Sequence, residues 1–133
     1  MAVTVTNTTI ASLNVDQTLT ANAATSTVAG GSEVFTFTPT KGTGKIALIM
    51  QSASTGVVPA TYSIAAGDLW AGKAITGTIG STAAAAATEV VEIETGRVLQ
   101  DDGTIAITVS PGDTGTSMLL GTHAFKMYAL ELI

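Results

Sequence analysis

Short segments in which every second residue is apolar run through the chain, and they constrain its fold more than any other feature. In "EVFTFT" (33–38), Phe35 and Phe37 fall on one face, and a valine and two threonines fall on the other. The same alternation recurs in "EVVEIE" (89–94) and "TIAITV" (104–109). Because successive side chains of a strand point to opposite faces, this pattern predicts β-strands with one buried face each.

Three further segments extend this pattern. "KIALIMQ" (45–51) is almost continuously apolar, which is typical of a strand buried on both faces. "TYSIA" (61–65) is a short strand, and in "FKMYALELI" (125–133) Tyr128, Leu130 and Leu132 share one side. Turn-forming mixtures such as "PTKGTG", "STGVVP" and "SPGDTG" separate the segments. We therefore expect one all-β domain over residues 31–133, an antiparallel β-sandwich or a barrel-like, jelly-roll-like fold.

Composition agrees with this fold class. The 133 residues fit one domain, and 24 of them are threonine, which suits a half-exposed sheet better than a helix. Only "STAAAAAT" (81–88) has real helix propensity, and a loop or a single turn is an equally good interpretation at that length. The chain has no cysteine, so disulfides and thiolate metal sites are excluded.

The first thirty residues differ from the rest because they are polar, small and free of aromatic side chains. One interpretation is a strand or two that complete the sheet within the same chain. The other is an extended N-terminal arm that becomes ordered against a neighbouring subunit, since backbone hydrogen bonds to a sheet edge need little from side chains. In the second case the candidate partner contacts are Val3, Val5, Ile10 and Leu13.

The net charge of −5 excludes some partners. Only four lysines and Arg97 oppose ten scattered acids, so no basic patch exists that could follow nucleic acid or an anionic membrane surface. No apolar run approaches the ~18 residues of a spanning helix. The start, "MAVTVTNTTI", lacks the features of a secretory signal, so we expect synthesis in the cytoplasm.

The stretch "TKGTGKIALIM" (40–50) resembles a phosphate-binding loop but lacks its essential residues. A Walker A loop would need glycine at the position of Pro39 and a hydroxyl at that of Ile46, followed by a helix. We interpret the stretch as a glycine-rich hairpin loop between the strands at 33–38 and 45–51.

No other residues form a recognisable catalytic, cofactor or metal motif. His123 is the only histidine, and no G-x-S-x-G elbow accompanies it, so we expect a structural or solvated side chain in a bend. Asp101 and Asp102 lack the spacing of a calcium loop and predict a tight turn before 104–109. Asp68 and Asp113 are expected to bond local backbone in their turns.

Two single residues leave alternatives open. Trp70, the only tryptophan, is either a core residue or an exposed platform for a sugar. Arg97 follows a strand end and is expected to pair with Glu94 or another acid, which would contribute ~1 kcal/mol or less near the surface.

Two longer stretches, "TYSIAAGDLWAGKAITGTI" (61–79) and "VEIETGRVLQDDGTIAITVS" (91–110), go beyond generic β-protein character. Together with the terminal "FKMYALELI", their order and spacing resemble head decoration, or cement, proteins of tailed bacteriophages. The resemblance covers roughly the last seventy residues and transfers no catalytic residue. It implies fold-defining turn positions at Gly67, Asp68, Glu94, Gly96, Arg97, Asp102 and Gly103.

The resemblance implies a non-enzymatic virion protein on the outside of a capsid. Its partners would be the major capsid protein and copies of itself, with a trimer favoured, and it would need no cofactor. Alternatives are a component of the phage tail or baseplate, or a carbohydrate-binding or adhesin-like β-sandwich module.

Overall fold

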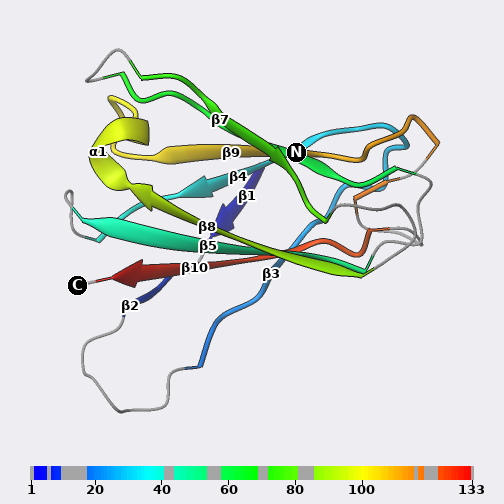
Figure 1. The fold of residues 1–133 in the computed structure, drawn as a ribbon, viewed down its shortest axis with the longest axis horizontal. Coiled ribbons are helices and arrows are strands. Elements are labelled where there is room, and N and C mark those ends of the chain that lie inside the picture. Colours follow the sequence, from blue (N-terminus) through cyan, green and yellow to red (C-terminus); the bar gives the residue numbers. More distant parts are fainter. Residues whose placement is uncertain are drawn as a thin grey trace.

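The computed structural model describes residues 2–5, 7–9, 18–40, 44–53, 58–68, 72–80, 86–115, 117–118 and 123–132. These residues form two β-sheets that pack face to face, as Figure 1 shows. The predicted all-β sandwich is therefore confirmed. A single helical turn, α1 (Thr95–Val98), is the only helix among the described residues, and it connects one sheet to the other.

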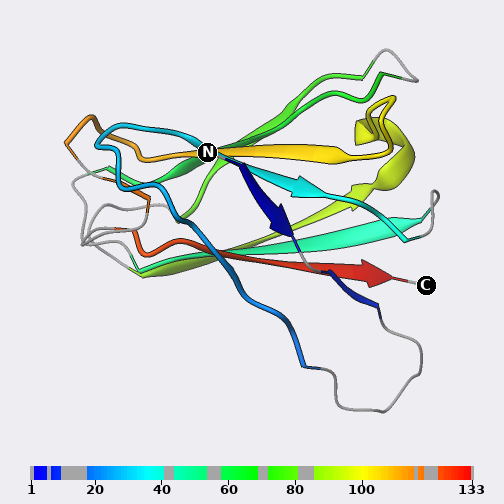
Figure 2. The same ribbon diagram turned by 180° about the vertical axis from the view of Figure 1, so that it is seen from behind.

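Each sheet has an antiparallel centre and a parallel strand at one edge. Sheet A runs in the order β1 (Ala2–Val5), β4 (Glu33–Phe37), β9 (Ile105–Ser110), β6 (Thr61–Ile64) and β7 (Ile75–Thr78). Sheet B runs in the order β2 (Asn7–Thr9), β10 (Lys126–Leu132), β5 (Lys45–Ser52) and β8 (Ala87–Glu94). The two-residue strand β3 (Asn22–Ala23) also pairs with β10. The parallel pairs are β1 with β4 and β2 with β10, so the N-terminal segment contributes one strand to each sheet (Figure 2).

The core lies between the sheets and is built largely from the alternate residues that the sequence pattern identifies. Strand β10 is the exception, because Met127 and Ala129 face the core, whereas Tyr128 and Leu130, which the pattern groups together, lie on the outer face. Phe35 and Phe37 are fully buried, and the rings of Phe35 and Phe125 meet edge to face with centroids 5.2 Å apart. That distance and geometry are favourable for aromatic pairs. The fully buried side chains also include Ile46, Leu48, Met50, Ile64, Ile79, Ile105, Ile107, Met118 and Met127.

All six segments expected as strands contain one, with ends that differ by a few residues. Strand β7 has no period-2 apolar pattern, because "ITGT" places Gly77 in its centre. The aromatic ring of Tyr62 on β6 lies against this glycine, and a Cβ at Gly77 would stand 2.5 Å from the hydroxyl oxygen of Tyr62. The tyrosine thus supplies the side-chain packing that the glycine lacks. Burial raises the pKa of Tyr62, and the charge of Glu89 raises it further.

The interpretation of "PTKGTG" as a hairpin loop is wrong. Strand β4 pairs with β1 and β9 in sheet A, whereas β5 pairs with β8 and β10 in sheet B, so the connection crosses from one sheet to the other. The backbone N–H and the hydroxyl of Thr40 donate to the buried carboxylate of Glu131 on β10. This contact ties the start of the crossing to sheet B.

The expectation that 45–51 is buried on both faces is only half fulfilled. Ile46, Leu48 and Met50 are buried in the core, while Ala47 and Ile49 on the opposite face are only partly buried. No second layer among the described residues covers that face of the strand. In the alanine-rich stretch 81–88, residues 81–85 lie outside the described residues and 87–88 belong to β8.

Candidate interaction surfaces

The four candidate contacts at the N-terminus fall partly within the described residues. Val3 and Val5 lie on β1, in register with Phe35 and Phe37 of β4. Ile10 and Leu13 lie outside the described residues. Strands β1, β2 and β3 pair with strands of their own chain. This arrangement corresponds to the interpretation in which the first thirty residues complete the sheets within the same chain. An exchange of this segment with a neighbouring subunit stays a prediction.

A buried carboxylate holds the segment that follows β3. Glu33, at the start of β4, is fully buried and accepts hydrogen bonds from the backbone N–H and the hydroxyl of Thr25 and from the N–H of Ser26. The distances from Thr25 N to the two carboxylate oxygens are 3.0 and 2.8 Å. Buried charges persist where donors surround them in this way, so Glu33 acts as an anchor for residues 25–26.

The turn positions implied by the resemblance come together at one corner of the sandwich. Gly67 N–H donates to the carbonyl of Arg97 at 3.0 Å, and Asp68 N–H donates to that of Leu99 at 3.1 Å. A Cβ at Gly67 would stand 2.8 Å from the carbonyl oxygen of Leu99, so this close approach requires glycine. The two stretches that carry the resemblance are therefore docked directly on each other.

The aspartates of these turns behave in two ways. Asp102 accepts from the N–H and the hydroxyl of Thr104, which lowers its carboxyl pKa, and Gly103 adopts a left-handed φ of 79°, as expected for a tight turn. Asp113 accepts from the N–H of Gly115, also a local bond. The expectation for Asp68 is wrong, because its side chain accepts from the backbone of Asp101, which is 33 residues away.

At the other turn positions implied by the resemblance, the structure does not require the particular residue that is present. A Cβ at Gly96 would meet nothing within 4 Å. Glu94 precedes α1 without a side-chain cap, and the expected pair of Arg97 with an acid is not found among the described residues. There the single salt bridge joins Lys45 and Glu92 at 2.9 Å, since these two side chains lie on adjacent strands.

His123 is structural. It is fully buried directly before β10, its Nδ1 lies 3.1 Å from the hydroxyl of Ser52, and its carbonyl accepts from Ala53 N–H at 2.7 Å. Its Nε2 is buried and has no hydrogen-bond partner among the described residues. Burial lowers the pKa of His123, and the charge of Asp113 partly opposes this. Ser52 is 1% exposed, so both side chains of this serine–histidine pair are buried.

The outer face of sheet A is uncharged and rich in hydroxyl groups. Strand register places on it the hydroxyl-bearing residues Thr36, Thr61, Ser63, Thr76, Thr78, Thr108 and Ser110, together with Val34 and Ala106. The hydroxyls of Ser32 and Ser110 are 2.6 Å apart. A shallow hollow of about 420 Å³ lies over β6, β7 and β9, and its lining consists of Thr61, Tyr62, Ser63, Thr76, Gly77, Thr78, Thr108 and Ser110.

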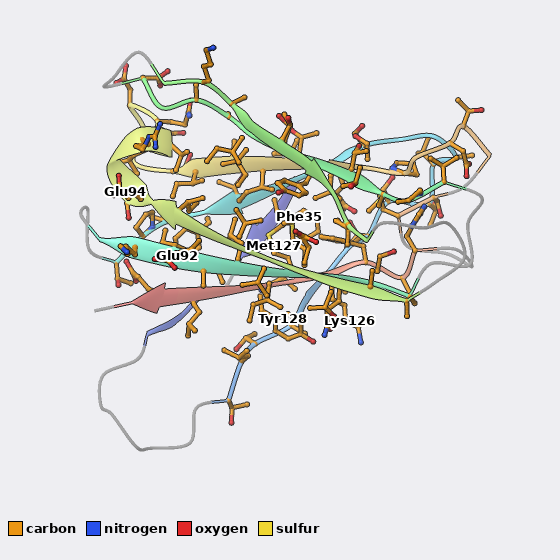
Figure 3. The ribbon with its side chains drawn as sticks, in the orientation of Figure 1. Phe35, Glu92, Glu94, Lys126, Met127 and Tyr128 are labelled. Atoms are coloured by element: carbon orange, nitrogen blue, oxygen red, sulfur yellow. The ribbon has the colours of Figure 1, made fainter. Side chains whose placement is uncertain are left out.

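The outer face of sheet B is different, because it has an apolar centre between charged ends. Register aligns Tyr128, Ile49 and Val90 in one row across β10, β5 and β8, and Leu130 and Ala47 in the next. Val90 is 60% exposed, and the other four side chains are partly buried. Figure 3 shows Tyr128 and Lys126 on the side of β10 away from Phe35, with Met127 between the sheets.

The charges of this face lie at its two ends. Lys126 shares one end with Gln51 and Thr88, while Glu92, Glu94 and Lys45 occupy the other. The hydrogen bond and the charge of Glu92 raise the pKa of Lys45. Sequence reasoning missed this surface, although the apolar residues on both sides of 45–51 were a signal for it.

Among the described residues, no three His, Asp or Glu side chains come together in a way that could hold a metal ion. In that part of the chain no helix is long and apolar enough to span a bilayer. Trp70 lies outside the described residues, so its role as core residue or sugar platform stays open. Comparison of the sequence with known protein families and with curated proteins finds no match to either.

Proposed function

We propose that this chain is a non-enzymatic structural protein that binds the outside of a bacteriophage capsid and stabilises it. In this proposal it is made in the host cytoplasm, and its partners are the major capsid protein and copies of itself. The resemblance of residues 61–79, 91–110 and 125–133 to capsid decoration proteins supplies the partner, and a trimer is the assembly that it implies.

The observation that carries an adhesive role is the outer face of sheet A. An outer face that presents hydroxyl groups and no charge can be covered by another protein without the cost of desolvating ions. Its hydroxyls both donate and accept hydrogen bonds, so a partner's polar groups can be satisfied across the contact. Many copies on one shell would multiply weak individual contacts.

Co-sedimentation with capsid shells tests this proposal. The protein is expected to pellet with shells of the major capsid protein at a fixed stoichiometry. Thr61→Lys places a charge on the exposed outer face of sheet A and is expected to lower binding, whereas Thr114→Lys, exposed in a loop, is the matched control. If the wild-type protein stays in the supernatant, the capsid proposal fails. A copy number tied to the tail would favour a tail or baseplate role.

The same hydroxyl-rich face also favours the second candidate, a carbohydrate-binding module, because neutral sugars are recognised by such hydrogen bonds. A glycan array, or fluorescence of the single Trp70 titrated with sugars, separates the two. A saturable response to one sugar class would favour the carbohydrate module over the capsid role.

A further inference from the structure

Strand β5 has the sequence of a strand covered on both faces, yet the structure covers only one. Strands with near-continuous apolar sequence occur where both faces of a sheet are packed. Here Ile49 and Ala47 point away from the core into the centre of the outer face of sheet B, flanked by Tyr128 and by Val90, which is 60% exposed. The mismatch indicates that another surface covers this face in the assembled state.

The charges on this face indicate what that surface is. The chain as a whole carries a net charge of −5, but the outer face of sheet B carries two lysines, Lys45 and Lys126, against two glutamates, Glu92 and Glu94. The charges are also separated. Lys126 stands alone at one end, and the other end, where Lys45 already pairs with Glu92, has an excess of one negative charge. Two such faces, related by a two-fold axis that lies in the contact plane through Ile49 and runs obliquely to the strands, place the positive corner of each, at Lys126 on β10, over the negative corner of the other on β8.

We propose that the outer face of sheet B is a docking surface for a second copy of this chain, packed face to face across a two-fold axis. The apolar row of Tyr128, Ile49 and Val90 forms the centre of the contact, and Lys126 of each copy lies over the Glu92–Glu94 end of its neighbour. A surface that meets itself in this way is self-complementary. It therefore pairs two single chains into a closed dimer, and it pairs two trimers into a closed hexamer where the two-fold axes lie perpendicular to the three-fold axis.

The size of the face sets the strength of the contact. Four strands at ~4.8 Å spacing and seven residues at ~3.3 Å rise cover about 450 Å² per copy. A standard stable interface buries roughly 800 Å² per partner. The pair is therefore weak in free solution and becomes populated at high concentration, or where many copies are held side by side.

Sedimentation equilibrium of the full chain, from ~10 µM to ~1 mM, tests the inference in the range where contacts this small associate. The average mass of the wild-type protein should rise with concentration toward twice that of the smallest unit. Val90→Asp, which puts a charge in the apolar centre, should weaken this association at least ~10-fold. Val28→Asp is the matched control, because Val28 is similarly exposed (64%) but lies outside this face, and it should leave the association unchanged.

A charge exchange provides a second test that does not depend on the apolar centre. Lys126→Glu and Glu94→Lys should each weaken the association about threefold, in line with exposed ion pairs, and the double variant should restore it. Both side chains are exposed, so the variants are expected to fold, and circular dichroism checks this.

Three results would overturn the inference. They are a wild-type mass that does not change over the range, equal behaviour of Val90→Asp and Val28→Asp, or a double charge variant no better than either single one. If the wild-type protein does not double but Val90→Asp lowers co-sedimentation with capsid shells while Val28→Asp does not, the face binds the capsid protein instead. If the mass of the protein doubles with concentration but the protein does not bind capsid shells, the docking surface is supported and the proposed function is refuted.

Discussion

Replacement of Glu33 by glutamine is expected to destabilise the protein by about 3 kcal/mol. The fully buried carboxylate accepts from Thr25 N at 3.0 and 2.8 Å, from the Thr25 hydroxyl at 2.6 Å and from Ser26 N at 3.1 Å. Hydrogen bonds to a charged group contribute roughly 1.5–3 kcal/mol each, and an unsatisfied buried donor costs a further 1–3 kcal/mol or so. The glutamine amide keeps one acceptor oxygen, but its NH2 group then faces the backbone N–H of Thr25, which lies close to both carboxylate oxygens in the wild type. One hydrogen bond to a charged oxygen is therefore lost, and one N–H of the new amide has no acceptor.

Equilibrium unfolding in urea measures this loss. For a chain of this size, the expected change corresponds to a fall in melting temperature of about 10 °C. Glu94→Gln is the control, since Glu94 is exposed on β8 and makes no salt bridge among the described residues. The reasoning is refuted if Glu33→Gln and Glu94→Gln unfold within ~0.5 kcal/mol of each other, which is the ordinary range for surface substitutions.

Gly77→Ala should destabilise by roughly 1–3 kcal/mol in a thermal melt, because the new Cβ would stand 2.5–2.7 Å from atoms of the Tyr62 ring. Gly96→Ala, where a Cβ meets nothing, should stay within ~0.5 kcal/mol of the wild type, and equal losses in the two variants would contradict the packing argument. Acid should destabilise the protein through His123, whose pKa is lowered in the folded state by burial despite Asp113. Its contribution is fully present above the unfolded pKa of about 6.5 and falls by up to ~1.4 kcal/mol per pH unit below it. Unfolding curves at pH 7.5 and 5.5 should thus differ more for the wild type than for His123→Gln, and parallel curves would refute this.

The sequence identified the parts of the fold that rest on local alternation. Segments such as 33–38 and 104–109 alternate strictly, so their strands and buried faces follow from the chain itself. Strand β7 lacked any such pattern, because its glycine depends on a tyrosine from the neighbouring strand. The crossing from β4 to β5 was also missed, since which strands pair is decided by distant residues and not by the loop between them.

The features of the candidate surfaces were likewise predictable where they depend on local bonds and not predictable where they depend on distant residues. The turn at Asp102–Gly103 was predictable, because its bonds are local. Asp68 was misjudged because its partner, the backbone of Asp101, is near only in the folded chain. The continuous apolar run at 45–51 predicted two packed faces, but in the structure only one is packed, and the other is the open outer surface of sheet B.

The central claim, a structural role on the outside of a capsid, is tested most directly by electron microscopy of purified virions that carry this protein. We expect density that fits this two-sheet sandwich at stoichiometric, symmetry-related positions on the outer surface of the shell. Particles with a bare shell, or with the protein absent from the virion altogether, would contradict it.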